Sequence, residues 1–93
     1  MESKFNIVYR SGRFSSLGSE VVVALLPAQH VGPGLHAVVS EWHPEFHHDG
    51  ELLYPERLST LILFPGSGGD SVSEAVKLAN TWDEDRYPER ATA

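Results

Sequence analysis

The chain has 93 residues, of which 41% are hydrophobic, and it carries a formal net charge of −6 at pH 7 with no cysteine. This composition is typical of one folded domain near the lower size limit for a single hydrophobic core, and it is too apolar for a disordered chain. The lack of cysteine excludes disulfides, thiolate metal sites and cysteine nucleophiles, and it favours a reducing, cytoplasmic setting.

The charge is spread unevenly. Residues 1–13 hold three cations against Glu2 (+2), residues 14–56 hold six acids and no Lys or Arg (−6), and residues 57–93 hold four cations against six acids (−2). Direct nucleic-acid binding is disfavoured because phosphate affinity needs a basic surface. An acidic surface suits a basic protein partner, although solubility alone also explains it. Apolar runs are too short for a membrane span, and the N-terminal sequence lacks the pattern of a secretory signal.

Apolar runs alternate with turn-forming segments along the chain. Alternation in residues 4–10 predicts a half-buried strand, and residues 11–19 are typical of a turn. The β-branched run 20–26 predicts a strand buried on both faces. Residues 27–34 contain two prolines and two glycines and are expected to form a loop. Residues 35–42 and 58–64 are further predicted strands.

One helix is predicted after the break at residues 65–69. Ser71 and Glu74 have the spacing of a capping box, and Asp70 adds negative charge where the helix dipole favours it. An apolar stripe at helical spacing continues to about residue 82: Val72, Ala75, Val76, Ala79 and Trp82. Residues 83–93 are charged and contain Pro88, so we expect a frayed or partner-ordered tail.

These elements predict an α+β fold: a small antiparallel four- to five-stranded sheet (a β-meander) with one C-terminal helix packed on one face. The predicted organisation is a single domain over residues 1–82 and a charged tail over residues 83–93. Strands 20–26 and 58–64 look apolar on both sides. The second sheet face therefore needs cover from a homodimer mate, another protein or the chain's own loops.

The segment EWHPEFHHDG (residues 41–50) is the candidate chemical site. Because Pro44 disfavours a helix, strand geometry is expected, with Glu41, His43, Glu45 and His47 on one face and Trp42, Pro44, Phe46 and His48 on the other. His43 and His47 would then lie roughly 13 Å apart, too far to share one zinc ion. A metal site from His43, Glu45, His47 and His48 would need a bend at Pro44 or ligands from elsewhere. Solvated strand residues and a pH-sensitive contact are the alternatives.

The turn after this segment is predicted to be a hairpin. A two-residue loop at Asp49-Gly50 would place Pro44 opposite Pro55 in a hydrogen-bonded pair, where neither proline has an N–H to donate. A four-residue loop over residues 48–51 avoids this loss by placing the prolines in a non-hydrogen-bonded pair. In that register Phe46 faces Leu53, His43 faces Glu56, and Trp42 faces Arg57.

The segment FPGSGGDS (residues 64–71) is similar to a phosphate-binding loop only in its glycines. A Walker loop requires Lys and then Ser or Thr after its last glycine, whereas Asp70 and Ser71 stand there. The carboxylate of Asp70 would also compete with a phosphate for the helix N–H groups. A simple connection with a helix cap is therefore favoured.

No stretch matches a family motif, so function is inferred from surface chemistry. The favoured hypothesis is a non-enzymatic acidic binding protein: an inhibitor or adaptor, of the phage-accessory type, that covers a basic and nucleic-acid-handling partner without any cofactor. The predicted contact residues are Glu41, Trp42, Glu45, Asp49, Glu51, Tyr54 and Glu56. The alternatives are a metal-dependent or acid–base enzyme that uses the His/Glu cluster at residues 41–51, and a structural subunit that oligomerises through its sheet face, for example as a homodimer.

Overall fold

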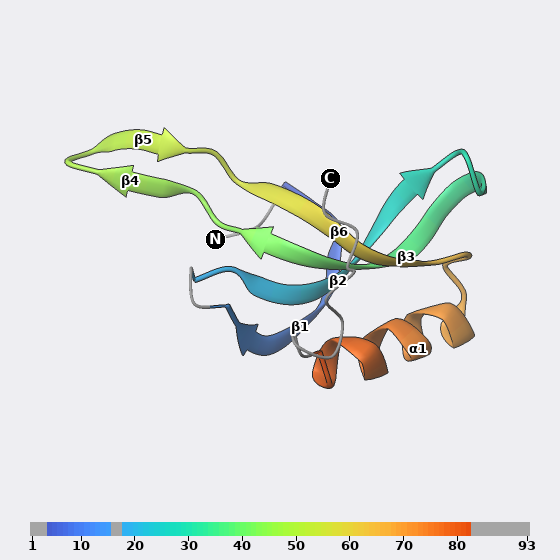
Figure 1. Ribbon diagram of the computed structural model, residues 1–93. Helices are drawn as coiled ribbons and strands as arrows, with labels where there is room; N and C mark the ends of the chain where they lie inside the picture. Colours follow the sequence, from blue (N-terminus) through green and yellow to red (C-terminus); the bar gives the residue numbers. More distant parts are fainter. Residues whose placement is uncertain (1–3, 16–17, 83–93) are drawn as a thin grey trace.

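The computed structural model describes residues 4–15 and 18–82, which form two antiparallel sheets and one helix (Figure 1). The elements are β1 (Ile7–Phe14), β2 (Glu20–Ala28), β3 (Gly32–His43), β4 (Phe46–His48), β5 (Glu51–Tyr54), β6 (Arg57–Phe64) and α1 (Gly69–Asn80). The main sheet has the order β1-β2-β3-β6, and β4 pairs with β5 in a second sheet. The predicted α+β fold, a four-stranded antiparallel sheet with one C-terminal helix on it, is confirmed. The predicted tail, residues 83–93, lies outside the described residues.

The core lies between the main sheet and α1. Alternate residues of the central strands face the helix, among them Val23 of β2 and Val39 of β3, and both are fully buried. Ala75 and Ala79 of α1 pack against them, and the short side chains let the helix approach the sheet closely. Trp82, just beyond the helix, is 6% exposed and closes one end of this core. The helical apolar stripe predicted over residues 72–82 is therefore confirmed.

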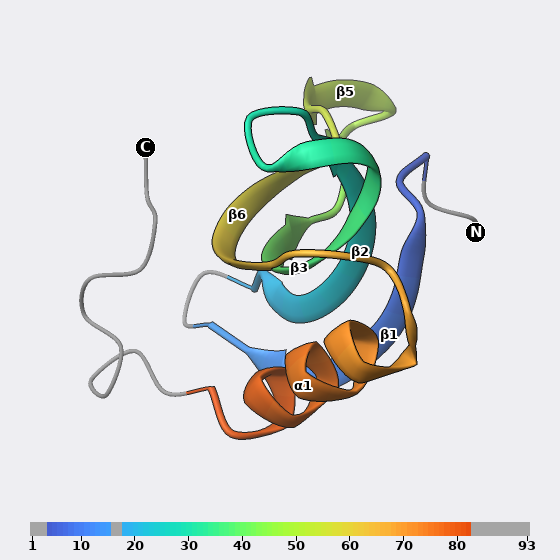
Figure 2. The same cartoon turned by 90° about the vertical axis from the view of Figure 1, so that its right-hand side faces the viewer.

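The second face of the sheet is covered by the curl of the sheet itself. Seen end-on, β2, β3 and β6 wind around one another while α1 lies beneath them (Figure 2). Val22, Ala24 and Ser40 are 0% exposed and Val38 is 2% exposed, although all four point away from the helix. We refer to this side as the concave face. Over β2 and β3 the chain thus covers both sheet faces, and no partner is needed there.

Two predicted connections are shorter in the structure. β1 continues to Phe14 through residues assigned to a turn, and only residues 29–31 separate β2 from β3. Pro27 is tolerated within β2 because β1 pairs with β2 only as far as Ala24. Beyond that point β2 has one neighbour, so an N–H missing on its free side costs no ladder hydrogen bond. β1 accommodates its glycine through a positive φ of 77° at Gly12 and a register shift between Arg10 and Phe14.

The predicted capping box is wrong. α1 begins at Gly69 with Gly68 as its N-cap, and no side chain caps it. The hydroxyl of Ser71 donates instead to the backbone carbonyl of Pro65 (2.6 Å). Gly66 donates its N–H to Nδ1 of His36 (2.7 Å), and Nε2 of the same ring lies 3.0 Å from the carbonyl of Gly32. The connection between β6 and α1 is thus held onto β3 through Gly66 and His36, and Ser71 closes the connection on itself by its bond to Pro65.

Candidate functional site

A two-stranded arm projects from one end of the main sheet (Figure 1). We define the arm as residues 44–56, which comprise β4, β5 and the two short connections that join them to β3 and β6. Pro44 and Glu45 interrupt one side of this ribbon, and Pro55 and Glu56 interrupt the other. Because proline cannot donate to a ladder, these pairs mark the boundary between the two sheets. The arm is therefore a separate two-stranded projection that continues the β3–β6 pair.

The arm ends in a two-residue turn. Asp49 has φ 53° and Gly50 has φ 83°, and His48 pairs directly with Glu51. Two consecutive positive φ values are the requirement of a type I′ turn, which Asp-Gly satisfies well. The predicted four-residue loop over residues 48–51 is wrong.

A register shift in the arm prevents Pro44 and Pro55 from pairing with each other. His47 pairs with Leu52 but Phe46 pairs with Tyr54, so Leu53 is an extra residue in β5. This bulge displaces all later pairs by one residue, and the main sheet accordingly pairs His43 with Arg57 and Trp42 with Leu58. The register predicted from an unbulged hairpin, including the Pro44–Pro55 pair, is therefore wrong by one residue.

The arm exposes four large apolar side chains. Phe46 is 52% exposed, Leu52 50%, Leu53 49% and Tyr54 65%. The rings of Phe46 and Tyr54 pack against each other with their centroids 6.1 Å apart and their planes tilted by 38°. Alternation places Phe46 on the same side of the segment as Trp42, but among the described strands β4 pairs only with β5, and Phe46 stays half exposed.

The histidines of this region each face one carboxylate. Nε2 of His47 lies 3.1 Å from Oε1 of Glu45, and Nε2 of His48 lies 3.3 Å from Oδ2 of Asp49. Nε2 of His43 is 3.9 Å from Oε1 of Glu41. The pairs are separate, and within residues 4–15 and 18–82 no group of three or more His, Cys, Asp or Glu side chains is arranged to hold a metal ion.

A groove of about 740 Å³ opens at the base of the arm. The rings of Phe46 and Tyr54 and both arm prolines line it, together with His43 and Arg57. Gly18 and Ser19, which directly precede β2, also line it. The aromatic pair therefore borders a mainly apolar hollow whose lining includes one carboxylate, Glu45, and one cation, Arg57.

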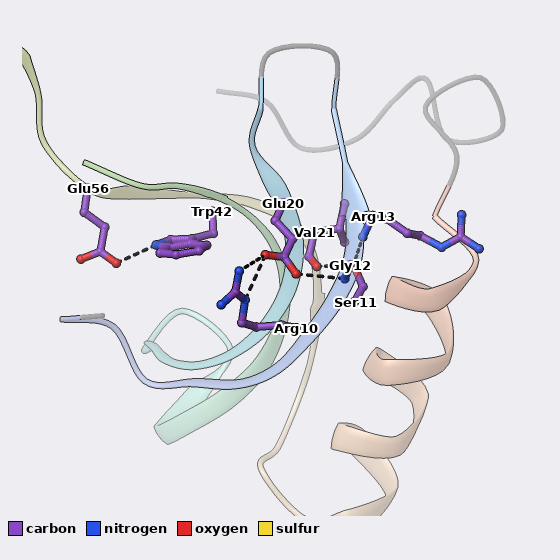
Figure 3. A network of polar contacts seen from close by, with 8 residues as sticks. All are labelled: Arg10, Ser11, Gly12, Arg13, Glu20, Val21, Trp42 and Glu56. Carbon is purple, nitrogen blue, oxygen red and sulfur yellow. Dashed lines mark hydrogen bonds and ion pairs between the residues drawn. The ribbon is translucent and has the colours of Figure 1, made fainter. Parts of the chain in front are cut away.

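The base of the arm rests on a polar network on the concave face (Figure 3). Glu20 is 2% exposed, and one of its oxygens accepts hydrogen bonds from Nε (3.0 Å) and Nη2 (2.7 Å) of Arg10. Its other oxygen accepts the N–H of Gly12 (2.9 Å). The hydrogen bond and the charge of Glu20 raise the pKa of Arg10, so the guanidinium stays charged at physiological pH.

Trp42 connects this network to the arm. The Arg10 guanidinium lies over the Trp42 ring, 5.0 Å from its centroid, and the indole N–H donates to Glu56 (2.6 Å). The other oxygen of Glu56 accepts the backbone N–H of Lys4 (3.1 Å). Figure 3 shows Arg10 between the Glu20 carboxylate and the Trp42 ring. The direction in which the arm leaves the sheet is therefore fixed at Glu56.

The predicted contact residues fall into two groups. Glu45, Asp49, Glu51 and Tyr54 are exposed and lie together on the arm. Glu41, Trp42 and Glu56 make internal hydrogen bonds, with Ser19 donating to Glu41 (2.8 Å). The sequence analysis missed Leu52 and Leu53. Their adjacency was the available signal, because two consecutive residues of a strand face opposite sides and a two-stranded ribbon can bury neither.

Comparison with protein-family models, with curated proteins and with solved structures gave no match. In the part of the chain that the structure describes, no helix is both long enough and apolar enough to cross a membrane. The function is therefore inferred from the arm and from the groove at its base.

Proposed function

We propose that this protein is a non-enzymatic adaptor or inhibitor that binds a basic protein partner by inserting its β4–β5 arm into the partner's surface. The observation that supports this most directly is the exposure of Phe46 and Tyr54, whose rings pack against each other at the surface of the arm. A two-stranded hairpin is marginally stable in water by itself. A partner that covers the aromatic pair would stabilise the arm and bury apolar surface at once.

The chemistry of the arm resembles that of an interface centre with a polar rim. Aromatic side chains dominate binding energy when a partner pocket desolvates them. Phe46 and Tyr54 supply this centre on the side of the groove, and Leu52 and Leu53 add apolar surface nearby. An arm that carries apolar groups in this way suits a cleft that encloses it better than a flat surface.

The charge of the arm selects the partner. Residues 44–56 contain four acids, Glu45, Asp49, Glu51 and Glu56, and no Lys or Arg. Complementary charge speeds association and orients the partners, whereas like charge disfavours the wrong ones. We therefore infer a partner cleft with an apolar floor and a rim of Lys and Arg. Raising the ionic strength should slow association, because exposed charges are screened beyond about 10 Å at 0.1 M salt.

Site-specific photo-crosslinking tests this proposal. A photoreactive phenylalanine analogue at position 54 is placed in the full chain and irradiated in extract from the source cells. We expect one adduct that unlabelled wild-type protein competes away and that weakens as salt is raised. A competitor carrying Phe46→Ala and Leu52→Ala should fail to displace it. Equal competition by this variant, or the same adduct from the analogue at exposed position 81, would reject the arm as the contact.

A further inference from the structure

A second surface, separate from the arm, is the outer edge of β6. β6 is the last strand in the order β1-β2-β3-β6, so among the described residues no strand pairs with its outer side. Residues 58–64 contain no charged residue, no proline and no glycine, and five of the seven are Leu, Ile or Phe. Folded proteins usually block such an edge with charges, prolines or short strands, because its free N–H and C=O groups pair readily with another chain.

The opposite edge strand of the sheet, β1, has features that hinder pairing with another chain. β1 carries Arg10 and Arg13, has a glycine at φ 77°, and shifts register twice against β2. These features twist the edge and place charge on it. β6 has one register shift, between its pairs with Val39 and Ser40, and its single charge is at its first residue, Arg57. The two edges of the same sheet therefore differ in their capacity to accept another strand.

We propose that a second copy of this chain docks on β6 in antiparallel orientation and continues the sheet across a two-fold axis. The axis passes between Thr60 and Leu61, so that Arg57 of one copy faces Phe64 of the other and Leu58 faces Leu63. On both sides of the axis this register keeps side chains on matching faces; at the axis itself Thr60, on the concave face, meets Leu61, which the register shift places on the helix face. Leu58 and Leu63 pair with Trp42 and Val38, which lie on the concave face, whereas Phe64 pairs with Ala37 on the helix face. Arg57 pairs with His43, which alternation places on the helix face as well.

Charge complementarity favours a second copy over any other strand. A groove of about 630 Å³ is lined by Phe64 of β6 and by residues of α1 that include one acid, Glu74, and one cation, Lys77. In the proposed register, Arg57 of one copy lies beside Phe64 of the other and within reach of its Glu74, while Lys77 lies about one turn further along α1. The two-fold axis forms this Arg57–Glu74 pair twice in each dimer. The edge also lacks the repulsion expected of an acidic chain, because residues 57–69 contain one cation and no acid.

Sedimentation velocity of the full chain from about 1 µM to about 500 µM tests the dimer by mass action. We expect a concentration-dependent dimer. Thr60 is exposed beside the axis, so Thr60→Lys brings two like charges together and should weaken dimerisation at least about tenfold. Gln29→Lys, an exposed position in the turn between β2 and β3, adds the same charge away from β6 and should leave the dimer unchanged. Thermal melts confirm that each variant folds.

Charge reversal tests the register. Arg57→Glu and Glu74→Arg should each weaken the dimer, and the double variant should restore it, because the pair is formed between copies. A chain that stays monomeric throughout the range, a dimer indifferent to Thr60→Lys, or a double variant without restoration would overturn the proposal. The Phe46→Ala, Leu52→Ala variant should still dimerise. Loss of the dimer in that variant would assign it to the arm and overturn the proposal without affecting the arm's role in binding.

Discussion

The indole N–H of Trp42 donates to the carboxylate of Glu56 across 2.6 Å, and this bond joins β3 to the residue at which the chain leaves the arm. Trp42 itself lies under the guanidinium of Arg10, which the buried carboxylate of Glu20 holds in place. The exposed arm is therefore attached to a hydrogen-bonded network on the main sheet that includes the buried carboxylate of Glu20. Holding the arm in one direction before binding reduces the conformational entropy lost when a partner encloses it.

Removal of this attachment should loosen the arm more than the core. Glu56→Ala leaves the half-buried Trp42 N–H without its acceptor, and we expect a loss of about 1–2 kcal/mol in unfolding free energy. Amide hydrogen exchange should accelerate in residues 46–54 and stay slow in β2 and β3. Glu45→Ala removes an exposed carboxylate from the same arm and should change stability by less than about 0.5 kcal/mol. Equal exchange rates in the two variants would contradict the attachment.

Arg10 should matter more than its exposure suggests. Its side chain is 59% exposed, but Arg10→Ala leaves the Glu20 carboxylate buried with only one of its three hydrogen bonds to nitrogen. An unpaired buried charge is strongly unfavourable, so the melting temperature should fall by several degrees at neutral pH. Arg13→Ala, three residues further along β1, is the matched control and should melt like the wild type. A loss of melting temperature of the same size in Arg13→Ala would refute the prediction.

The type I′ turn makes Gly50 specifically sensitive. Gly50→Ala forces a side chain onto a residue with φ 83° and should cost about 1 kcal/mol. The effect should appear as faster exchange in the arm, with the core unchanged. Gly68→Ala, at the start of α1, is the control because Gly68 has φ −73° and an added Cβ meets no atom within 4 Å. If the two variants behave alike, the turn does not require glycine.

Ser40 offers a stabilising substitution. Its hydroxyl is buried on the concave face and has no hydrogen-bond partner in the described part of the chain. Ser40→Ala removes an unsatisfied polar group at little cost in volume, and the unfolding free energy should rise by up to about 1 kcal/mol. Ser19→Ala removes a buried hydroxyl that does donate to Glu41, and it should destabilise by about 1 kcal/mol. Chemical denaturation of both variants measures the contrast, and a loss of stability in Ser40→Ala would contradict it.

The strands and the helix could be predicted because their periodicity reflects burial. The run 20–26 is buried on both faces as its β-branched residues indicate, and the stripe from Val72 to Trp82 packs against the sheet. The curl that covers the concave face could not be predicted, because it depends on twist accumulated over several paired strands. The sequence therefore left open whether a homodimer mate, another protein or the chain's own loops cover the second face, whereas over β2 and β3 the curled sheet covers it itself.

The hairpin was located correctly as a segment but not in its geometry. An acidic, histidine-bearing hairpin near residues 41–51 was predicted, and the exposed acids Glu45, Asp49 and Glu51 lie there. The prediction assumed one residue opposite one residue throughout the hairpin, and it therefore missed the bulge at Leu53. The predicted partners of Phe46 and Trp42 were displaced by one residue for this reason. The buried role of His36, which binds the loop before α1, had no sequence signal because its partners are backbone groups.

The extra residue in β5 bends the ribbon where the arm joins the sheet, without changing which residues pair on either side of it. If Leu53 were deleted, His47 would still pair with Leu52 and Phe46 with Tyr54, and the sheet would keep its pairs from His43 and Arg57 onward. The ladder would then run through the arm without a bulge. Because a bulge bends and twists the strand that carries it, the straightened arm would leave the sheet in another direction. A change of one residue in length would thus alter which surface the protein presents to a partner while leaving its core untouched.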